Sequence, residues 1–136
     1  MDYISNSPSQ TENLAKKFLI KNPGVNLIGL SGDLGSGKTV FVKGIAKALG
    51  IKRNITSPTF VIEKIYQIKD RQLVHIDAYR LSRQDDLQSI GFDEFANDQG
   101  NIIVIEWPEQ IFSKIPEKMK IINFNYVSEN ERKISF

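Results

Sequence analysis

The chain has 136 residues, which is enough for one domain with a hydrophobic core but too few for a separate substrate domain. Its 18 basic and 16 acidic residues give a net charge of +2, too small to argue for nucleic acid as a direct ligand, and the lack of cysteine excludes disulfides and thiolate chemistry. No run approaches a membrane span and the first residues lack the features of a signal peptide, so we expect a cytoplasmic protein with no membrane partner.

The first third of the chain predicts a helix, a strand and a second helix. Residues 7–20 predict a helix because a serine in the N-cap position precedes a proline and an apolar stripe follows. The apolar run at 25–30 predicts a strand. Residues 40–49 predict the second helix, which Gly50 would end.

The segment 32–39 lies between this strand and the second helix and has the pattern G-x-x-x-x-G-K-[ST] of a P-loop. Its glycines let backbone N–H groups turn toward a phosphate, and the helix that follows adds the positive end of its dipole. Lys38 would supply a charge to the β- and γ-phosphates and the Thr39 hydroxyl would ligate Mg²⁺; a glycine-rich turn with a helix-capping threonine is the alternative. The predicted nucleotide-binding residues here are Asp33, Leu34, Gly35, Ser36, Gly37, Lys38, Thr39 and Val40.

The middle of the chain predicts a polar loop and a hairpin. In the loop at 54–59, Thr59 could reach a γ-phosphate or serve only as a turn residue. The alternating run 60–67 and the apolar run 73–77 predict two strands. The residues between them are too few for a crossover, so we expect an antiparallel hairpin.

The second half of the chain predicts short helices and three strands. Residues 82–90 predict a short helix that begins with a capping box, and 92–96 would add another turn. The apolar run 102–105 is typical of a strand buried on both faces of a parallel sheet. Residues 108–115 predict a helix and 118–136 predict two edge strands.

Two predicted strands end in a carboxylate, one at Asp77 and the other at Glu106. In open α/β sheets ligands bind beyond the carboxyl ends of the strands, so both carboxylates should lie beside the P-loop. Asp77 would hold Mg²⁺ or merely cap the next turn, and Glu106 would orient the attacking water or merely pair with a basic residue. The expected fold is a single α/β domain over residues 1–136: a three-layer α/β/α P-loop NTPase with a mixed, mostly parallel sheet that contains one antiparallel hairpin.

Three further side chains have a role that the motifs do not determine, and two of them have more than one interpretation. His75, the only histidine, alternates with apolar residues and fits a packed, hydrogen-bonded core position. Trp107 fits core packing or a contact with adenine or a partner protein. Arg80 fits an arginine finger or a surface ion pair.

The segments 32–39, 56–60, 75–80 and 106–107, taken together, resemble the TsaE (YjeE) family. The likeness runs from the first helix to Trp107 and is weak after about residue 115, where we assign no function. It implies a small Mg²⁺-dependent ATPase that joins TsaB and TsaD, is slow alone, and sustains synthesis of N6-threonylcarbamoyladenosine at position 37 of tRNAs that read ANN codons. The tRNA would be met only through that complex.

The resemblance also assigns roles by matching position. It implies that Lys38 and Glu106 are catalytic, that Thr39, Asp77 and Glu106 bind the metal, and that Thr59 lies near the γ-phosphate. Two other functions stay open from the residues alone. A small-metabolite kinase would need an acceptor pocket and an arginine-bearing lid, for which only the acidic segment 82–99 is available. A non-hydrolysing, nucleotide-dependent scaffold would keep the P-loop while Glu106 did no chemistry.

Overall fold

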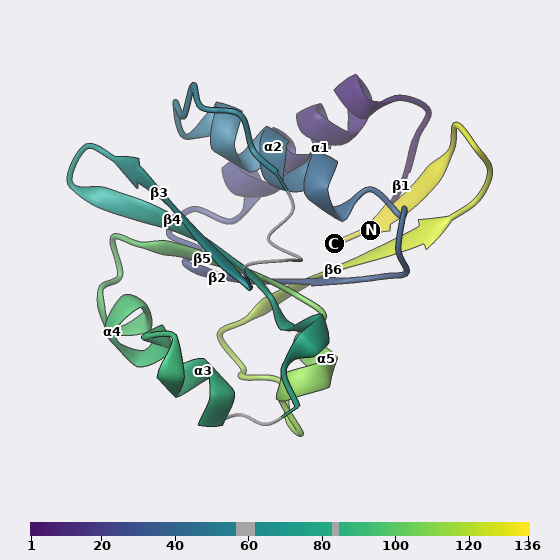
Figure 1. The fold of residues 1–136 in the computed structure, drawn as a ribbon. Coiled ribbons are helices and arrows are strands. Elements are labelled where there is room, and N and C mark those ends of the chain that lie inside the picture. The colour runs from purple at the N-terminus through teal and green to yellow at the C-terminus, as the bar shows by residue number, and fades with distance from the viewer. Residues whose placement is uncertain (57–61, 83–84) are drawn as a thin grey trace.

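A computed structural model describes residues 1–56, 62–82 and 85–136, and these form one seven-stranded sheet with the order β1-β7-β6-β2-β5-β4-β3 (Figure 1). The strands are β1 (Asp2–Ser5), β2 (Leu27–Ser31), β3 (Glu63–Ile68), β4 (Arg71–Asp77), β5 (Ile102–Glu106), β6 (Lys120–Tyr126) and β7 (Arg132–Ser135). The helices are α1 (Pro8–Lys21), α2 (Lys38–Ala48), the 3-10 turn η1 (Ala78–Arg80), α3 (Asp85–Ser89), α4 (Phe92–Asn97) and α5 (Pro108–Ile111).

The helices cover both faces of the sheet, which confirms the three-layer α/β/α fold. Helices α1 and α2 lie on one face, and α3, α4 and α5 lie on the other (Figure 1). Each face has its own core: Phe18 and Phe41 pack over β2 and β6 on the first, and Leu87 and Phe112 pack over β4 and β5 on the second. Among the described residues, no helix is both long and apolar enough to cross a bilayer.

The centre of the sheet is parallel and its margins are antiparallel. Strand β2 pairs in parallel with β5 and β6, and β5 pairs in parallel with β4. The predicted hairpin is confirmed, since β3 and β4 pair antiparallel. Because β2 lies at the centre, the P-loop that follows it emerges from the middle of the sheet edge.

The prediction that 118–136 form two edge strands is wrong in one respect. Both strands form, but β6 lies between β2 and β7, and β7 is covered by β1. Strand β1 has only four residues, too short to give a periodic signal, and its position depends on contacts with the far end of the chain. Tyr3 stacks on Phe136 at 4.7 Å between ring centroids, and Asp2 pairs with Lys133 at 2.7 Å.

Gly44 allows α2 to approach α1 closely. A Cβ added at Gly44 would lie 2.6 Å from the carbonyl oxygen of Glu12 and 2.7 Å from the Cβ of Ala15. We therefore expect Gly44→Ala to lower the free energy of unfolding by about 1–3 kcal/mol, although alanine is the better helix former. Thermal or urea unfolding measures this. The control is Ala48→Gly, at an exposed position of the same helix, which measures the difference in helix propensity between alanine and glycine without the steric contact. If Gly44→Ala stabilised the protein, the close approach of α1 and α2 would be contradicted.

Glu63 is a partly buried carboxylate at the start of β3. Burial raises its pKa above the ordinary value of 4.5, and its Oε2 has no hydrogen-bond partner within the described ranges. At a pH between the pKa of Glu63 in the unfolded chain and its higher pKa in the folded protein, the folded protein holds a proton that the unfolded chain has released. The free energy of unfolding therefore falls as the pH rises through this range.

Glu63→Gln removes this titration. We expect the variant to unfold at a higher temperature than the wild type at pH 8, by up to about 3 °C, and at the same temperature near pH 4. Thermal unfolding across this pH range measures the difference. The matched control is Glu117→Gln, at an exposed glutamate; a gain that did not depend on pH would contradict the explanation.

Candidate functional site

The P-loop joins β2 to α2 in a conformation that only glycine adopts without strain. Gly35 and Gly37 have φ angles of 74° and 100°, and Gly37 is the N-cap of α2 without any side-chain hydrogen bond to the helix end. A Cβ at Gly32 would lie 2.5 Å from the carbonyl oxygen of Phe124 in β6. In such loops, backbone N–H groups of the loop and of the first turn of the following helix are the donors that bind phosphate.

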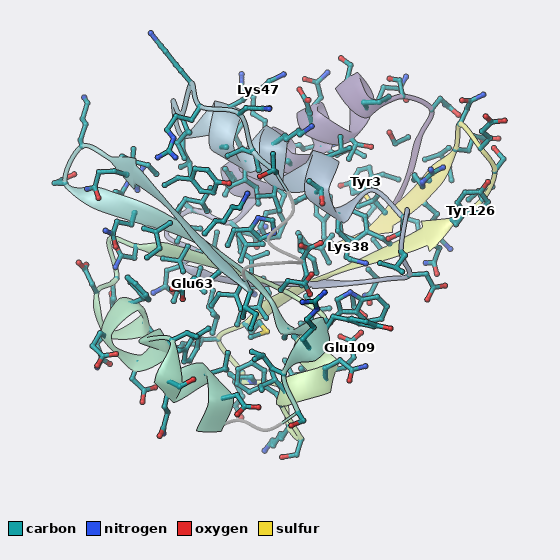
Figure 2. All side chains as sticks on the ribbon, in the orientation of Figure 1. Tyr3, Lys38, Lys47, Glu63, Glu109 and Tyr126 are labelled. Atoms are coloured by element: carbon teal, nitrogen blue, oxygen red, sulfur yellow. The ribbon has the colours of Figure 1, made fainter. Side chains whose placement is uncertain are left out.

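Lys38 is nearly buried in the first turn of α2 and folds back over the loop. Its Nζ donates to the carbonyl oxygens of Gly32 and Asp33, the latter at 3.0 Å, and lies 4.4 Å from the centroid of the Trp107 ring. Desolvation by burial lowers the pKa of Lys38, and the carboxylates of Glu106, Asp77, Glu109 and Asp33 oppose this change. Figure 2 shows Lys38 near the middle of the view, with Glu109 below it.

The two strand-ending carboxylates meet at this edge. In the parallel register Asp77 pairs with Glu106, and Glu106 pairs with Leu30 of β2. A pocket of about 280 Å³ lies between the loop and these strand ends. Asp77 and Glu106 are both largely buried at its wall, with exposed fractions of 7% and 4%. The lining residues are Leu34, Gly35, Ser36, Gly37, Lys38, Thr39, Val40, Asp77, Glu106, Trp107 and Arg132.

The structure therefore brings together most of the predicted site residues. Asp33 is not among those that line the pocket; its side chain is exposed, and its carbonyl oxygen accepts a hydrogen bond from Lys38. Thr59 lies outside the described residues. Asp77 lines the pocket, and its role as a Mg²⁺ ligand stays a prediction. Its capping role is confirmed, because its Oδ1 accepts a hydrogen bond of 3.0 Å from the backbone N–H of Tyr79 at the start of η1.

Trp107 lines the pocket, and Tyr79 packs beside it. Their ring centroids are 5.3 Å apart, and Trp107 adopts a positive φ of 60° where β5 ends and α5 begins. Its backbone N–H donates to the carbonyl oxygen of Leu30, which ties the turn to the strand that carries the P-loop. Arg80 belongs to η1 and is not one of the residues that line the pocket.

Two residues reach the site without a sequence signal that pointed to them. Arg132 of β7 donates from Nε to the carbonyl oxygen of Gly35 at 3.0 Å, and its guanidinium also binds the carbonyl oxygen of Ser128. His75 of β4 is fully buried, and its Nε2 lies 2.9 Å from Oε2 of Glu106. The contact of Arg132 depends on sheet order. His75 shares a strand face with Asp77, and the pairing of Asp77 with Glu106 across β4 and β5 brings it near Glu106, so this contact follows only once the register is known.

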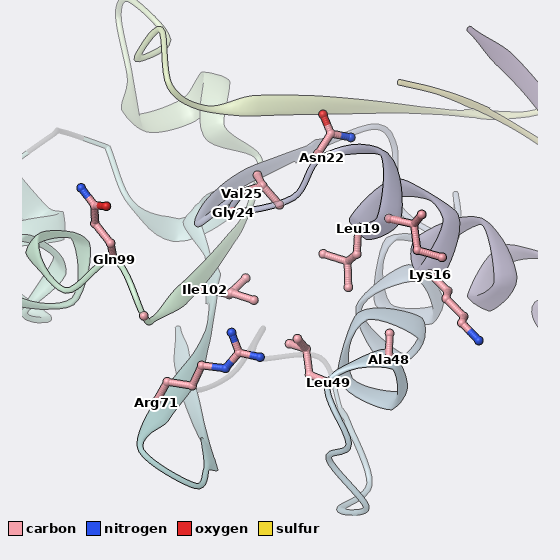
Figure 3. Close-up of a pocket in the computed structure, with 12 residues that line it drawn as sticks. Lys16, Leu19, Asn22, Gly24, Val25, Ala48, Leu49, Arg71, Gln99 and Ile102 are labelled. Carbon is pink, nitrogen blue, oxygen red and sulfur yellow. The ribbon is translucent and has the colours of Figure 1, made fainter.

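A second cavity, of about 320 Å³, lies at the other end of the parallel strands. Arg71 of β4, Ile102 at the start of β5 and Leu49 after α2 face it (Figure 3). Ligands of open α/β sheets bind beyond the carboxyl ends of the strands, whereas this cavity lies at the amino end of β5. We therefore place the functional site at the P-loop.

The geometry defines a class of protein. A glycine-rich loop connects the central parallel strand β2 to helix α2. Lys38 at the end of this loop lines the same pocket as the carboxylates of Asp77 and Glu106, which end two neighbouring strands. This is the arrangement of a P-loop nucleotide-binding domain.

Comparison with known proteins narrows the class. The model of the family described as "Threonylcarbamoyl adenosine biosynthesis protein TsaE" matches residues 5–134, so the chain belongs to the TsaE family. The tRNA threonylcarbamoyladenosine biosynthesis protein TsaE of Bacillus subtilis is 37% identical over 96% of this chain and 80% of its own length. The protein of the same name from Borreliella burgdorferi is 41% identical over 77% of this chain and 76% of its own.

A solved structure gives the same result. The crystal structure of Bacillus subtilis YdiB superposes with a TM-score of 0.73 and 30% sequence identity, over 98% of this chain and 82% of that one. The resemblance drawn from the four sequence motifs is thereby confirmed.

Proposed function

We propose that this chain is the ATP-hydrolysing subunit of the system that makes threonylcarbamoyladenosine in tRNA, and that it acts through a complex with TsaB and TsaD. The observation that carries the proposal is the single pocket that joins Lys38 and Thr39 of the P-loop to Asp77 and Glu106. Family membership supplies the biosynthetic context. Residues that bind phosphate together with carboxylates that could act on water are the parts that a nucleotide hydrolase requires.

The nucleotide would extend from the P-loop into a neighbouring pocket. This pocket has a volume of about 200 Å³ and shares Gly37, Val40 and Arg132 with the phosphate site. Its other wall comes from residues 5–8 and Thr11. The triphosphate would lie over the loop, and the nucleoside would lie between the start of α1 and the β6–β7 turn.

The residues present suit Mg²⁺. This ion takes oxygen ligands and is held by one or two protein groups together with substrate phosphates, and the Thr39 hydroxyl and the carboxylates of Asp77 and Glu106 are such groups. The described residues contain no cluster of three or more His, Cys, Asp or Glu that would form an all-protein metal site. When bound, Mg²⁺ would neutralise charge that develops on the phosphate oxygens.

Two side chains of this protein would have separate roles in hydrolysis, one in binding the phosphates and one in activating water. Lys38 would leave the carbonyl oxygens of Gly32 and Asp33 and bind the β- and γ-phosphates. Glu106 would orient a water molecule in line with the γ-phosphorus and take its proton as the new P–O bond forms and the bond to the β-phosphate oxygen breaks. The products are ADP and inorganic phosphate.

The experiment is ATP turnover by the purified chain, alone and with a purified TsaB–TsaD complex. We expect slow release of phosphate from the chain alone and faster release with the partners. Binding of ATP without release of phosphate in either mixture would favour a scaffold. Transfer of phosphate to a small acceptor in place of water would favour a kinase.

A further inference from the structure

The only histidine of the chain contacts the carboxylate to which we assign the chemistry. His75 and Glu106 lie on the adjacent parallel strands β4 and β5, in a register that pairs His75 with Val104 and Asp77 with Glu106. Nε2 of His75 lies 2.9 Å from Oε2 of Glu106, and the exposed fractions of the two residues are 0% and 4%. Water has little access to this hydrogen bond.

The second ring nitrogen argues against a role in packing alone. An ionised carboxylate only accepts hydrogen bonds, so Nε2 must carry the hydrogen and Nδ1 is left as an acceptor. Nδ1 is buried and has no partner within the described ranges. A leucine would fill the same core space without an unpaired polar atom, so the imidazole is explained by its hydrogen bond to Glu106.

The hydrogen bond from His75 engages only one of the two carboxylate oxygens of Glu106. Oε2 of Glu106 accepts from His75, whereas Oε1 has no hydrogen bond to any residue that the structure describes. Glu106 also lines the pocket with Lys38 and Thr39. On the function proposed above, we propose that His75 is a positioning residue that fixes Glu106 through Oε2, so that Oε1 is the oxygen presented to the attacking water.

The kinetic test compares three replacements of His75 in the assay with TsaB and TsaD. The amide nitrogen of glutamine can reach the place of Nε2, whereas that of asparagine falls near Nδ1, so His75→Gln and His75→Asn form a matched pair. We expect His75→Leu and His75→Asn to lower kcat by about 10- to 100-fold with little change in KM for ATP, and His75→Gln to recover much of the loss. Equal kcat values for the two amide variants, at equal thermal stability, would overturn the proposal.

A double-mutant cycle separates this role from that of Glu106. If His75 acts only through Glu106, then His75→Leu should cause no further loss of kcat in a Glu106→Gln background. An undiminished additional loss would show that His75 acts by another route. If Glu106→Gln itself left turnover intact, the assignment of Glu106 as the base would be wrong, whereas absence of ATP turnover in the wild type with its partners would contradict the proposed function; both outcomes differ from a failure of His75 alone.

A spectroscopic test needs neither nucleotide nor partners. Because the chain contains one histidine, the ¹⁵N ring spectrum of the labelled protein reports on His75 without assignment. We expect the tautomer with hydrogen on Nε2, which a free imidazole also prefers, with its Nε2–H proton shifted downfield and protected from exchange by the hydrogen bond to Glu106, and we expect Glu106→Ala to remove that shift and that protection. A ring that carries its hydrogen on Nδ1, or a spectrum unchanged in Glu106→Ala, would overturn the positioning contact whatever the chain hydrolyses.

Discussion

Glu106→Gln is expected to reduce ATP hydrolysis in the presence of TsaB and TsaD by about 10²- to 10⁴-fold while ATP still binds. The amide keeps the size of the side chain but cannot accept the proton of the attacking water, and general base catalysis contributes a factor of this order. Phosphate release measures the loss. Binding can be followed through Trp107, which is the only tryptophan and lines the pocket.

Glu109→Gln is the matched control. Glu109 lies at the same end of the molecule, and its carboxylate accepts a hydrogen bond from the Ser31 hydroxyl, but it does not line the pocket. This variant should therefore hydrolyse ATP at close to the rate of the wild type. If the two variants lost activity equally, the carboxylate charge at this edge and not the position of Glu106 would explain the effect.

Lys38→Ala is expected to weaken binding of ATP by about 10- to 100-fold and to remove detectable hydrolysis. The lysine is the one charged donor that the P-loop itself contributes, and its Nζ now contacts two carbonyl oxygens of the same loop. Because burial already disfavours its charged form, we expect the substitution to leave thermal stability unchanged or slightly raised. Titration of the Trp107 fluorescence and thermal unfolding measure the two effects.

Lys43→Ala tests whether the loss is specific. Lys43 lies on the same helix, and it is not one of the residues that line the phosphate pocket. The Lys43→Ala variant should therefore bind and hydrolyse ATP like the wild type. Wild-type affinity in Lys38→Ala would contradict the assignment of the pocket to the phosphates.

The phosphate loop and the strand ends could be predicted because local chemistry determines them. The glycines at 35 and 37 are required by positive φ angles, and a continuous apolar run such as 102–105 is typical of a strand that is buried on both faces. The rule that ligands bind beyond the carboxyl ends of strands then placed Asp77 and Glu106 beside the loop, and the structure has both at its wall.

The features that were not predicted all depend on which distant segments pair. Strand β1 is ordered by Phe136 and Lys133, and Arg132 reaches Gly35 because β6 and β7 continue the sheet beyond β2. The interpretation of His75 as a packed residue was correct about its burial but could not include Glu106, since the register of β4 on β5 is not a local property.

The position of β2 at the centre of the sheet has a consequence for synthesis on the ribosome. The two strands that flank β2 are both made after the P-loop, and the residue that binds Gly35 follows it by 97 positions. Contacts between segments so far apart in sequence form late, because the intervening chain must first be closed into a loop. A nascent chain would therefore carry the whole phosphate-binding motif yet gain affinity for nucleotide only when its last strands emerge.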